Sequence, residues 1–334
     1  MVKNNMWEVF TDSDLAWDNL IIDKGCRIPY QLSAWANSKS DDGWSAIKLI
    51  YKNQDDLSTV RTALQILIKK KFMITIAWIP GGAIGDLDVF DVSFTKKIKS
   101  LTHSKLIYCR MNLMREYNSQ DIIFLKASLW RKPDYLLNSG KSMSLKTTIT
   151  LDDLRLNFSG NWRHNLKRSE KKNIVIEKWE NPQANDLYEI YLNMQSIKNI
   201  GVQFSLQQLQ SIIVSFGSKL VIYKCVNSDG CIIAFRGVVI VGSNAFDIFA
   251  AANHEARRVY ATYGIFWSIL DFCVHNRIGN YDLGGIDPVN NMGVYNFKKG
   301  TGADAMEYLG EWDYSSVSIL RFFANKYLSK RGDF

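Results

Sequence analysis

The sequence predicts an α/β (α+β) protein of two tandem domains, in which mixed, largely antiparallel sheets are flanked by helices. The chain has 334 residues, roughly twice the length of an ordinary small domain. Strand-like and helical segments alternate in the first half, as in crossover units. In the second half, three apolar runs joined by short turns precede a long helical segment. We therefore expect a first domain at residues 1–147 and a second at 148–334.

The composition is that of a globular protein that needs no metal ion or disulfide bond to stabilise its fold. Apolar residues make up 47% of the chain and charged residues 22%. The first ten residues lack the apolar core of a secretory signal. An odd number of cysteines without a C-x-x-C pair indicates reduced thiols in the cytoplasm and no metal site; they are Cys26, Cys109, Cys225, Cys231 and Cys273. We expect no bound cofactor.

A formal net charge of +8 favours an anionic partner. Candidates are a nucleotide, a pyrophosphate, tRNA or anionic lipid, and DNA is not expected. Lipid as a partner would place this cytoplasmic protein in peripheral contact with the inner face of the membrane. The alternative is that the charge serves solubility alone.

Hydrophobic periodicity gives the elements of the first half. We predict strands at 44–52 and 72–79, with an amphipathic helix at 56–71 between them. A further helix at 93–101 and a strand at 105–113 add another unit. Together these segments predict alternating strands and helices.

The second half has clearer boundaries. Three strands are joined by NSDG and VGSN, which have hairpin-turn chemistry. Helices flank these strands, and a last strand follows the longest helix, an order that is typical of the second half of a GNAT core. The predicted helices are 162–172, 185–197 and 256–276, and the predicted strands are 174–179, 219–226, 231–241, 244–252 and 281–285.

The second hairpin predicts a charged pair. With the turn at 242–243, Asp247 faces Val238 and Arg236 faces Phe249. Arg236 and Asp247 then lie diagonally on one face of the sheet, within reach of each other. The pair is either a structural ion pair or part of a charged cleft, because charges on apolar strands need a partner or water.

A basic segment begins the predicted second domain. Arg163, Lys167 and Lys171 recur at intervals of four and share one side of a helix. Like charges at this spacing repel unless an anion neutralises them. The segment is either a solvated face or, in our preferred interpretation, a phosphate-binding face.

The C-terminal block places Lys298 between aromatic residues and glycines. Tyr295 and Phe297 precede it, and Gly300 and Gly302 follow. A lysine whose surroundings are shaped by glycine could meet a developing oxyanion. The alternative is a surface lysine in a turn.

These segments resemble the FemABX family of aminoacyltransferases. The block YDLGGID followed by GVYNFKKGTGADAMEYLGEWDY is similar to the family's "G-x-Y-x-F-K-x-G-x-G" and "E-Y-x-G-x-x-D" signature. The early QLSAWANSK, from Gln31 to Lys39, is similar to its "Q-S-x-x-W-A-x-x-K" motif. The basic helix R-x-N-L-K-x-S-E-K-K matches the start of its second domain.

The resemblance implies two tandem GNAT-like domains, without a coiled-coil arm, and an acceptor bound in a cleft. It implies that Lys298 stabilises the transition state. It also implies that Lys39, Arg163 and Lys167 contact the phosphates of a nucleotide-linked acceptor.

Other candidates come from the neighbouring residues. Asp247 is the candidate for an acid-base or amine-orienting role. Substrate-binding candidates are Arg236, Phe249, Phe297 and Tyr295. Family members acting on peptidoglycan precursors tend to have tyrosines where this chain has Asp247 and Phe249, so the acceptor stays open.

Three functions follow. The first is aminoacyl-tRNA-dependent addition of an amino acid to a nucleotide- or lipid-linked cell-envelope precursor of the peptidoglycan type. The second is acyl-CoA-dependent acylation of an amino sugar in surface polysaccharide biosynthesis. The segment RRVYATYG has only one glycine where a CoA pyrophosphate loop needs more, which disfavours the second. The third is a non-catalytic module that binds a nucleotide sugar or tRNA.

Overall fold

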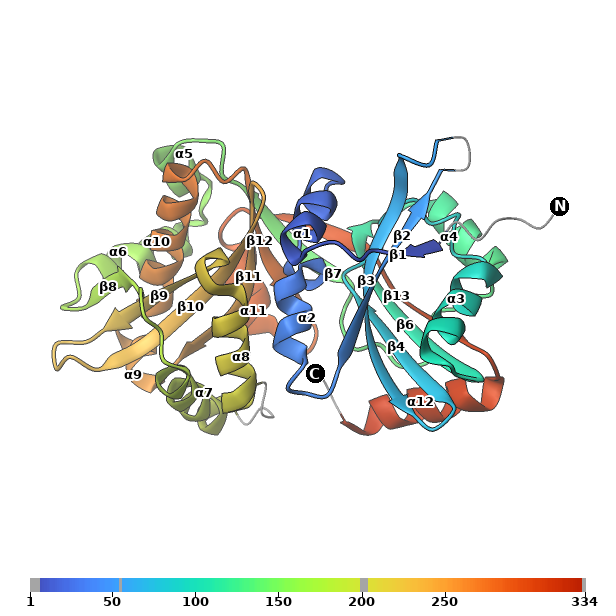
Figure 1. The fold of residues 1–334 in the computed structure, drawn as a ribbon. Coiled ribbons are helices and arrows are strands. Elements are labelled where there is room, and N and C mark those ends of the chain that lie inside the picture. Colours follow the sequence, from blue (N-terminus) through green and yellow to red (C-terminus); the bar gives the residue numbers. More distant parts are fainter. Residues whose placement is uncertain (1–6, 54–55, 199–203, 332–334) are drawn as a thin grey trace. The chain divides into compact units, whose positions relative to one another are not determined.

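The computed structural model describes residues 7–53, 56–198 and 204–331. The chain forms two compact units (Figure 1): unit 1 combines Met1–Gly140 with Glu307–Phe334, and unit 2 is Lys141–Met306. Each unit contains a mixed, largely antiparallel sheet flanked by helices. The predicted fold class is confirmed.

The sheet of unit 1 has the order β1-β2-β3-β4-β6-β13. Only the β4–β6 pair is parallel within this order. The strands are β1 (Trp7–Val9), β2 (Ser45–Lys52), β3 (Val60–Lys71), β4 (Ile74–Pro80), β6 (Leu106–Glu116) and β13 (Asp304–Ser315), and the short β5 (Ile84–Gly85) pairs with β3. The helices are α1 (Asp14–Asp23), α2 (Ser33–Lys39), α3 (Val92–Thr102), α4 (Ser119–Ala127) and α12 (Ser318–Arg331), with a 3₁₀ turn at Pro29–Gln31.

The predicted helix at 56–71 is wrong, because this segment contains strand β3. Residues 62–68 of the strand are all buried. A strand buried on both faces loses polar–apolar alternation and becomes a nearly continuous apolar run. Such a run can also match a helical period.

The sheet of unit 2 has the order β7-β12-β11-β10-β9-β8. Only β11 and β12 pair in parallel within this order, over Asn244–Phe246 and Asn280–Asp282. The strands are β7 (Lys141–Lys146), β8 (Val175–Lys178), β9 (Leu220–Val226), β10 (Ile232–Val241), β11 (Asn244–Ala252) and β12 (Asn280–Gly285). The helices are α5 (Leu151–Asn157), α6 (Gly160–Glu170), α7 (Ala184–Lys198), α8 (Leu206–Phe216), α9 (His254–Arg258), α10 (Ala261–His275) and α11 (Met292–Lys299), with a 3₁₀ turn at Gly217–Lys219.

The β10–β11 hairpin has the predicted register near its turn and a different one beyond it. Asp247 lies opposite Val238, as predicted. Arg236 lies opposite Ala250 instead of Phe249, because the register shifts at Gly237. A Cβ at Gly237 would lie 2.3 Å from the Phe249 ring. Because Gly237 has no Cβ, the Phe249 ring can pack against its backbone at the position where the register shifts.

The C-terminal residues belong to unit 1. Strand β13 pairs with β6 along Gly310–Ser315. Helix α12 follows directly and contacts β6. The ranges predicted for the two domains, 1–147 and 148–334, assigned these residues to the second domain, whereas their contacts place them with the N-terminal residues.

Candidate functional site

Lys298 lies in the last turn of α11 and is buried, with 6% of its surface exposed. Its Nζ donates to the Gly284 carbonyl at 3.1 Å and to the Gly285 carbonyl at 2.8 Å. An ammonium has three N–H donors. The two carbonyls use two of them, and no further hydrogen bond of this ammonium is found within the described part of the chain. The third N–H of Lys298 thus has no acceptor among the described residues.

The carbonyls that accept hydrogen bonds from Lys298 belong to a turn at the end of β12. Gly284 has φ +75°, a left-handed conformation that favours glycine. Its N–H donates to Asp282 Oδ1 at 2.8 Å. The Ser142 hydroxyl donates to the same oxygen at 2.6 Å. Asp282 and Ser142 thus fix the turn that positions the ammonium.

Arg236 and Asp247 form the ion pair that the hairpin predicted. Arg236 Nε lies 3.2 Å from Asp247 Oδ1 and 3.1 Å from Oδ2. About a tenth of each side chain is exposed, 10% and 9%. The guanidinium also lies 5.2 Å from the Phe266 ring centre and 5.5 Å from that of Phe297. The pair is largely removed from water and enclosed by aromatic rings.

Lys298 belongs to the same electrostatic cluster. Burial lowers the pKa of Lys298 from 10.5 to about 8, because desolvation disfavours the charged form. The charge of Asp247 opposes this shift, and that of Arg236 adds to it. With a pKa of about 8, the side chain is mainly protonated at neutral pH.

Tyr281 adds a buried hydroxyl beside Arg236. The residue is fully buried, and its ring stacks on Phe266 at 5.6 Å. Its hydroxyl makes no hydrogen bond of standard geometry within the described residues. Burial raises the pKa of Tyr281 well above its usual 10, so this group stays protonated.

The aromatic candidates pack in the core of unit 2. The Phe297 carbonyl accepts from Trp162 Nε1 at 3.2 Å, and the two rings lie 5.7 Å apart. Phe249 is 5% exposed and lies 5.8 Å from the ring of Phe235. Tyr295 is half-buried, with Lys299 Nζ 5.7 Å from its ring. These contacts fix α11 and the hairpin, and a role of these rings in substrate binding stays a prediction.

The basic helix α6 carries Arg163 and Lys167 on its exposed side. Arg163 Nη1 donates to the carbonyls of Leu156 and Phe158, both at 2.8 Å. These carbonyls lie at the C-terminal end of α5, where helix carbonyls lack intrahelical partners. Arg163 thus stabilises a helix end, and phosphate binding by Arg163 and Lys167 stays a prediction.

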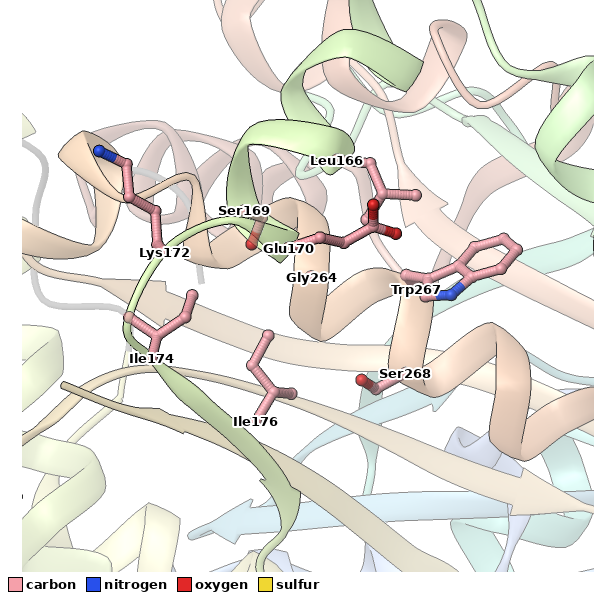
Figure 2. A pocket seen from close by; sticks show the side chains of 9 residues that line it. All are labelled: Leu166, Ser169, Glu170, Lys172, Ile174, Ile176, Gly264, Trp267 and Ser268. Carbon is pink, nitrogen blue, oxygen red and sulfur yellow. The ribbon is translucent and has the colours of Figure 1, made fainter. Parts of the chain in front are cut away.

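An open pocket lies beside the C-terminal half of α6, between that helix, β8 and α10 (Figure 2). The Ser169 hydroxyl is buried there without a hydrogen bond to any described residue. A Cβ at Gly264 would come within 2.7 Å of this hydroxyl, so glycine allows α10 to approach α6. The lining residues are Leu166, Ser169, Glu170, Lys172, Ile174, Ile176, Gly264, Trp267 and Ser268. Neither Lys298 nor Asp247 is among them.

Lys39 lies at the end of α2 in unit 1. Its side chain is 13% exposed, and Nζ lies 3.6 Å from Asp42 Oδ2 and 4.8 Å from the Trp35 ring centre. Burial lowers the pKa of Lys39. Because Lys39 and Arg163 belong to different units, their convergence on one cleft stays a prediction.

Gln31, the first residue of the same motif, has a structural role. Its Nε2 donates to the Pro80 carbonyl at 2.8 Å, and its Oε1 accepts from the Gln65 N–H at 2.6 Å. The side chain therefore joins β3 to the end of β4.

Sequence reasoning missed Asp282, Ser142 and Tyr281. Tyr281 and Asp282 lie inside the YDLGG block, so the block itself was a signal. Ser142 lies on β7, about 140 positions earlier, and no local pattern connects it to Asp282.

Comparison with known proteins gives one family match and several similar structures. The FemAB family matches residues 224–330, which include Arg236, Asp247 and Lys298. The structure of FemX superposes with a TM-score of 0.79 and 15% identity, covering 95% of this chain and 100% of that one.

The FemABX resemblance is confirmed.

Other solved structures share the fold with this chain. A tandem GNAT protein from the clavulanic acid biosynthesis pathway has a TM-score of 0.57 and 9% identity, covering 93% of this chain and 98% of that one. The C-terminal domain of a lysylphosphatidylglycerol synthetase from Agrobacterium fabrum has a TM-score of 0.56 and 14% identity, covering 93% and 95%. No curated protein matches the chain in sequence. At these identities the similarities establish the fold alone.

The described residues contain neither a metal-binding cluster nor a helix that could span a membrane. No group of three or more His, Cys, Asp or Glu residues could hold a metal ion there. None of the helices in this part of the chain is long and apolar enough to cross a membrane.

Proposed function

We propose that this FemABX-type chain transfers an aminoacyl group from aminoacyl-tRNA to an amine of a nucleotide- or lipid-linked cell-envelope precursor of the peptidoglycan type. The observation that carries the proposal is the buried Lys298 ammonium, with one donor available, in a cluster with the Arg236–Asp247 pair. The cluster lies within the residues that match the FemAB family.

The chemistry assigned to Lys298 is stabilisation of the oxyanion. The neutral acceptor amine attacks the carbonyl carbon of the donor ester, and a C–N bond forms as negative charge develops on the carbonyl oxygen. The third N–H of Lys298 donates to that oxygen in a site with little water. The ester C–O bond then breaks, and the leaving hydroxyl takes the proton that the amine loses.

Asp247 is assigned an orienting role. Both of its oxygens contact the Arg236 guanidinium, so the carboxylate is already committed to a charged partner. It can still hold a protonated or polarised amine electrostatically. A general-base role would require it to leave Arg236 at a desolvation cost.

The donor assignment rests on charge and on the loop before α10. A net charge of +8 suits a polyanionic donor. In the RRVYATYG segment, Tyr260 is the N-cap of α10 and has a left-handed backbone conformation. Its hydroxyl accepts a hydrogen bond from Arg168 Nη1 at 2.7 Å. The single glycine of this segment lies inside α10, and its tyrosine is tied to α6, an arrangement that does not favour a CoA pyrophosphate.

The test is a transfer assay on the purified protein with a nucleotide-linked muramyl peptide as acceptor. Aminoacyl-tRNA and acyl-CoA are compared as donors. We expect transfer from aminoacyl-tRNA that persists without CoA, stops after RNase treatment and decreases steeply with salt. Transfer from acyl-CoA in the presence of RNase would overturn the donor assignment. Absence of transfer from both donors would overturn the proposed function.

A further inference from the structure

Helix α12 presents an aromatic face to solvent. Phe322 and Phe323 are 56% and 58% exposed, and Ile319 and Tyr327 are 65% and 54% exposed. These positions follow a spacing of three and four residues, so they share one side of the helix. Large apolar side chains gathered in this way mark an interaction surface.

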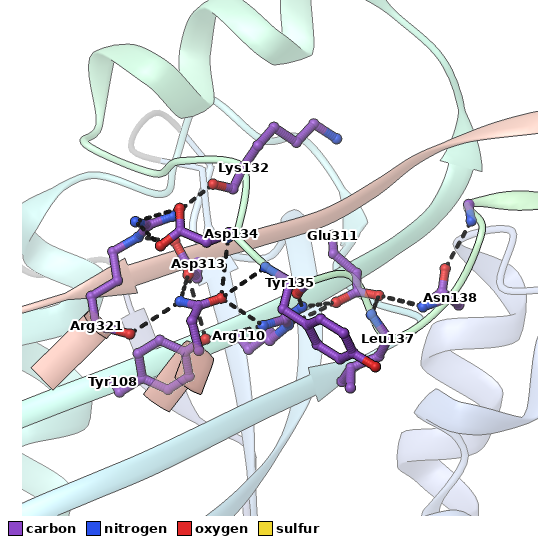
Figure 3. A network of polar contacts seen from close by, with 12 residues as sticks. Tyr108, Arg110, Lys132, Asp134, Tyr135, Leu137, Asn138, Glu311, Asp313 and Arg321 are labelled. Carbon is purple, nitrogen blue, oxygen red and sulfur yellow. Dashed lines mark hydrogen bonds and ion pairs between the residues drawn. The ribbon is translucent and has the colours of Figure 1, made fainter. Parts of the chain in front are cut away.

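The opposite side of the helix is polar and faces the interior of unit 1. Arg321 Nε donates to Asp313 Oδ1 at 2.8 Å, and its Nη1 lies 2.9 Å from Asp134 Oδ2. Asn325 is 4% exposed, and its Nδ2 donates to Asp313 Oδ2 at 2.9 Å. Figure 3 shows Arg321 extending toward Asp134 and Asp313 in this network. These bonds fix the rotation of α12, so its aromatic side is held outward.

Positive charge accompanies the aromatic side chains. The α12 sequence SILRFFANKYLSKR contains no acidic residue. Lys326 and Lys330 fall on the aromatic side of the helix and are exposed, and Lys326 Nζ lies 5.7 Å from the Phe322 ring centre. Lysine stems can cover apolar surface while their charges reach an anionic layer.

A second element with the same chemistry lies near the start of α12. Strand β3 ends with Lys70 and Lys71, and the β3–β4 turn that follows contains Phe72, which is 85% exposed. Met73, the next residue, bonds through its carbonyl to the N–H groups of Lys105 and Leu106. Just before α12, the Ser316 N–H bonds to the carbonyl of residue 107. Both elements thus adjoin the beginning of β6, at one end of unit 1 (Figure 1).

We propose that this basic aromatic surface, formed by α12 and the β3–β4 turn, binds an anionic membrane surface. Helix α12 has 14 residues, about 21 Å of helix, which suits a helix lying in the plane of the interface. The chain's charge of +8 complements anionic headgroups. A second copy of the chain is a poorer occupant, because a symmetric contact would bring Lys326 and Lys330 against the same lysines. The proposal does not depend on the transferase function.

Vesicle sedimentation tests the proposal on the full chain. Phosphatidylcholine vesicles with and without phosphatidylglycerol are compared at low and high salt. The test variants are the doubles Phe322→Ser/Phe323→Ser and Lys326→Glu/Lys330→Glu, and the single Phe72→Ser. We expect binding only to the anionic vesicles, weakening with salt. Each double variant should lose about tenfold or more in affinity, and Phe72→Ser should lose less.

Matched controls change the same chemistry elsewhere. Val214→Ser/Val289→Ser replaces two apolar residues that are 68% and 83% exposed. Lys146→Glu/Lys178→Glu reverses two exposed charges in unit 2. Both controls should bind like the wild type, and thermal unfolding should show that all variants fold. Absence of wild-type binding, or an equal loss in the controls, would overturn the proposal. So would a dimer in gel filtration that Phe322→Ser/Phe323→Ser dissociates when no vesicle binding occurs.

Discussion

At the residue scale, Lys298 combines two tasks in one side chain. Its bonds to the Gly284 and Gly285 carbonyls attach α11 to the end of β12, while its remaining donor is the one proposed for catalysis. A substitution therefore affects both packing and chemistry. The two effects are separated by measuring turnover and unfolding on the same variants.

Lys298→Ala is expected to lower kcat by about 10² to 10³, the usual effect of removing one oxyanion donor. The KM for the acceptor should change much less, because the interaction is made in the transition state. Lys299→Ala is the matched control, since the neighbouring lysine is exposed. Steady-state kinetics on folded variants provide the measurement. Normal turnover of Lys298→Ala with both substrates saturating would remove Lys298 from the mechanism.

The lowered pKa of Lys298 predicts a pH dependence of activity. The ammonium is needed at the oxyanion, and it loses its proton as the pH rises through about 8. We therefore expect kcat to decrease above pH 8 in the wild type. A kcat that is constant up to pH 10 would contradict the requirement for the ammonium.

The same shift predicts a pH dependence of stability. Between pH 8 and 10.5 the unfolded state binds more protons at Lys298 than the folded state does. Stability rises with pH wherever the unfolded state binds more protons. The wild type should thus gain free energy of unfolding relative to Lys298→Met across this window, in urea titrations at each pH. The control Lys299→Met keeps Lys298 and should show the same gain relative to Lys298→Met, and loss of that gain would assign the effect to another group.

The residues of the candidate site differ in how far sequence could predict them. Arg236 and Asp247 were predictable because a short turn fixes the register of a hairpin. The pairing of Ser142 with Asp282 was not, because the two residues come from strands far apart in the chain. Only the folded sheet brings β7 beside β12.

At the scale of elements, the turn after β12 determines where Lys298 binds. Gly284→Ala should destabilise the protein by about 1–2 kcal/mol, because its φ of +75° is costly for alanine. The new Cβ would also lie 3.4 Å from the Asp247 carbonyl oxygen. Gly285→Ala is the control, since its Cβ would meet only the Lys141 carbonyl, at 3.8 Å. Chemical denaturation measures both, and equal stabilities would show that the turn tolerates a side chain.

The errors at this scale have physical causes. Segment 56–71 was assigned to a helix because the burial of residues 62–68 removes the alternation that identifies a strand. The register of the β10–β11 hairpin shifts by one from Gly237 onward, at the position where the ring of Phe249 lies over that glycine. Turn chemistry fixes the first pairs of a hairpin, and side-chain packing decides whether a bulge follows.

At the scale of the whole molecule, the chain returns to unit 1 after completing unit 2. Glu311 on β13 is 2% exposed and binds the buried Arg110 of β6, with Arg110 Nε 2.7 Å from Glu311 Oε2. The other carboxylate oxygen of Glu311, Oε1, accepts hydrogen bonds from the N–H groups of Leu137 and Asn138 at 2.8 and 2.9 Å. Hydrophobic periodicity predicts where a strand begins and ends, but it does not predict which strand it pairs with. The sequence alone therefore assigned the C-terminal residues to the domain that precedes them in the chain.

This return of the chain makes a prediction about local stability. Glu311→Ala leaves the Arg110 guanidinium buried without its carboxylate, a change that typically costs about 3–5 kcal/mol. Hydrogen exchange, followed by mass spectrometry, should show lost protection in residues 60–116 and much less change in residues 141–306. This result is expected although Glu311 follows unit 2 in the sequence. Glu307→Ala on the same strand is the control, because Glu307 is exposed. If protection were instead lost mainly in residues 141–306, β13 would contribute to the stability of unit 2, and the assignment of the C-terminal residues to unit 1 would be wrong.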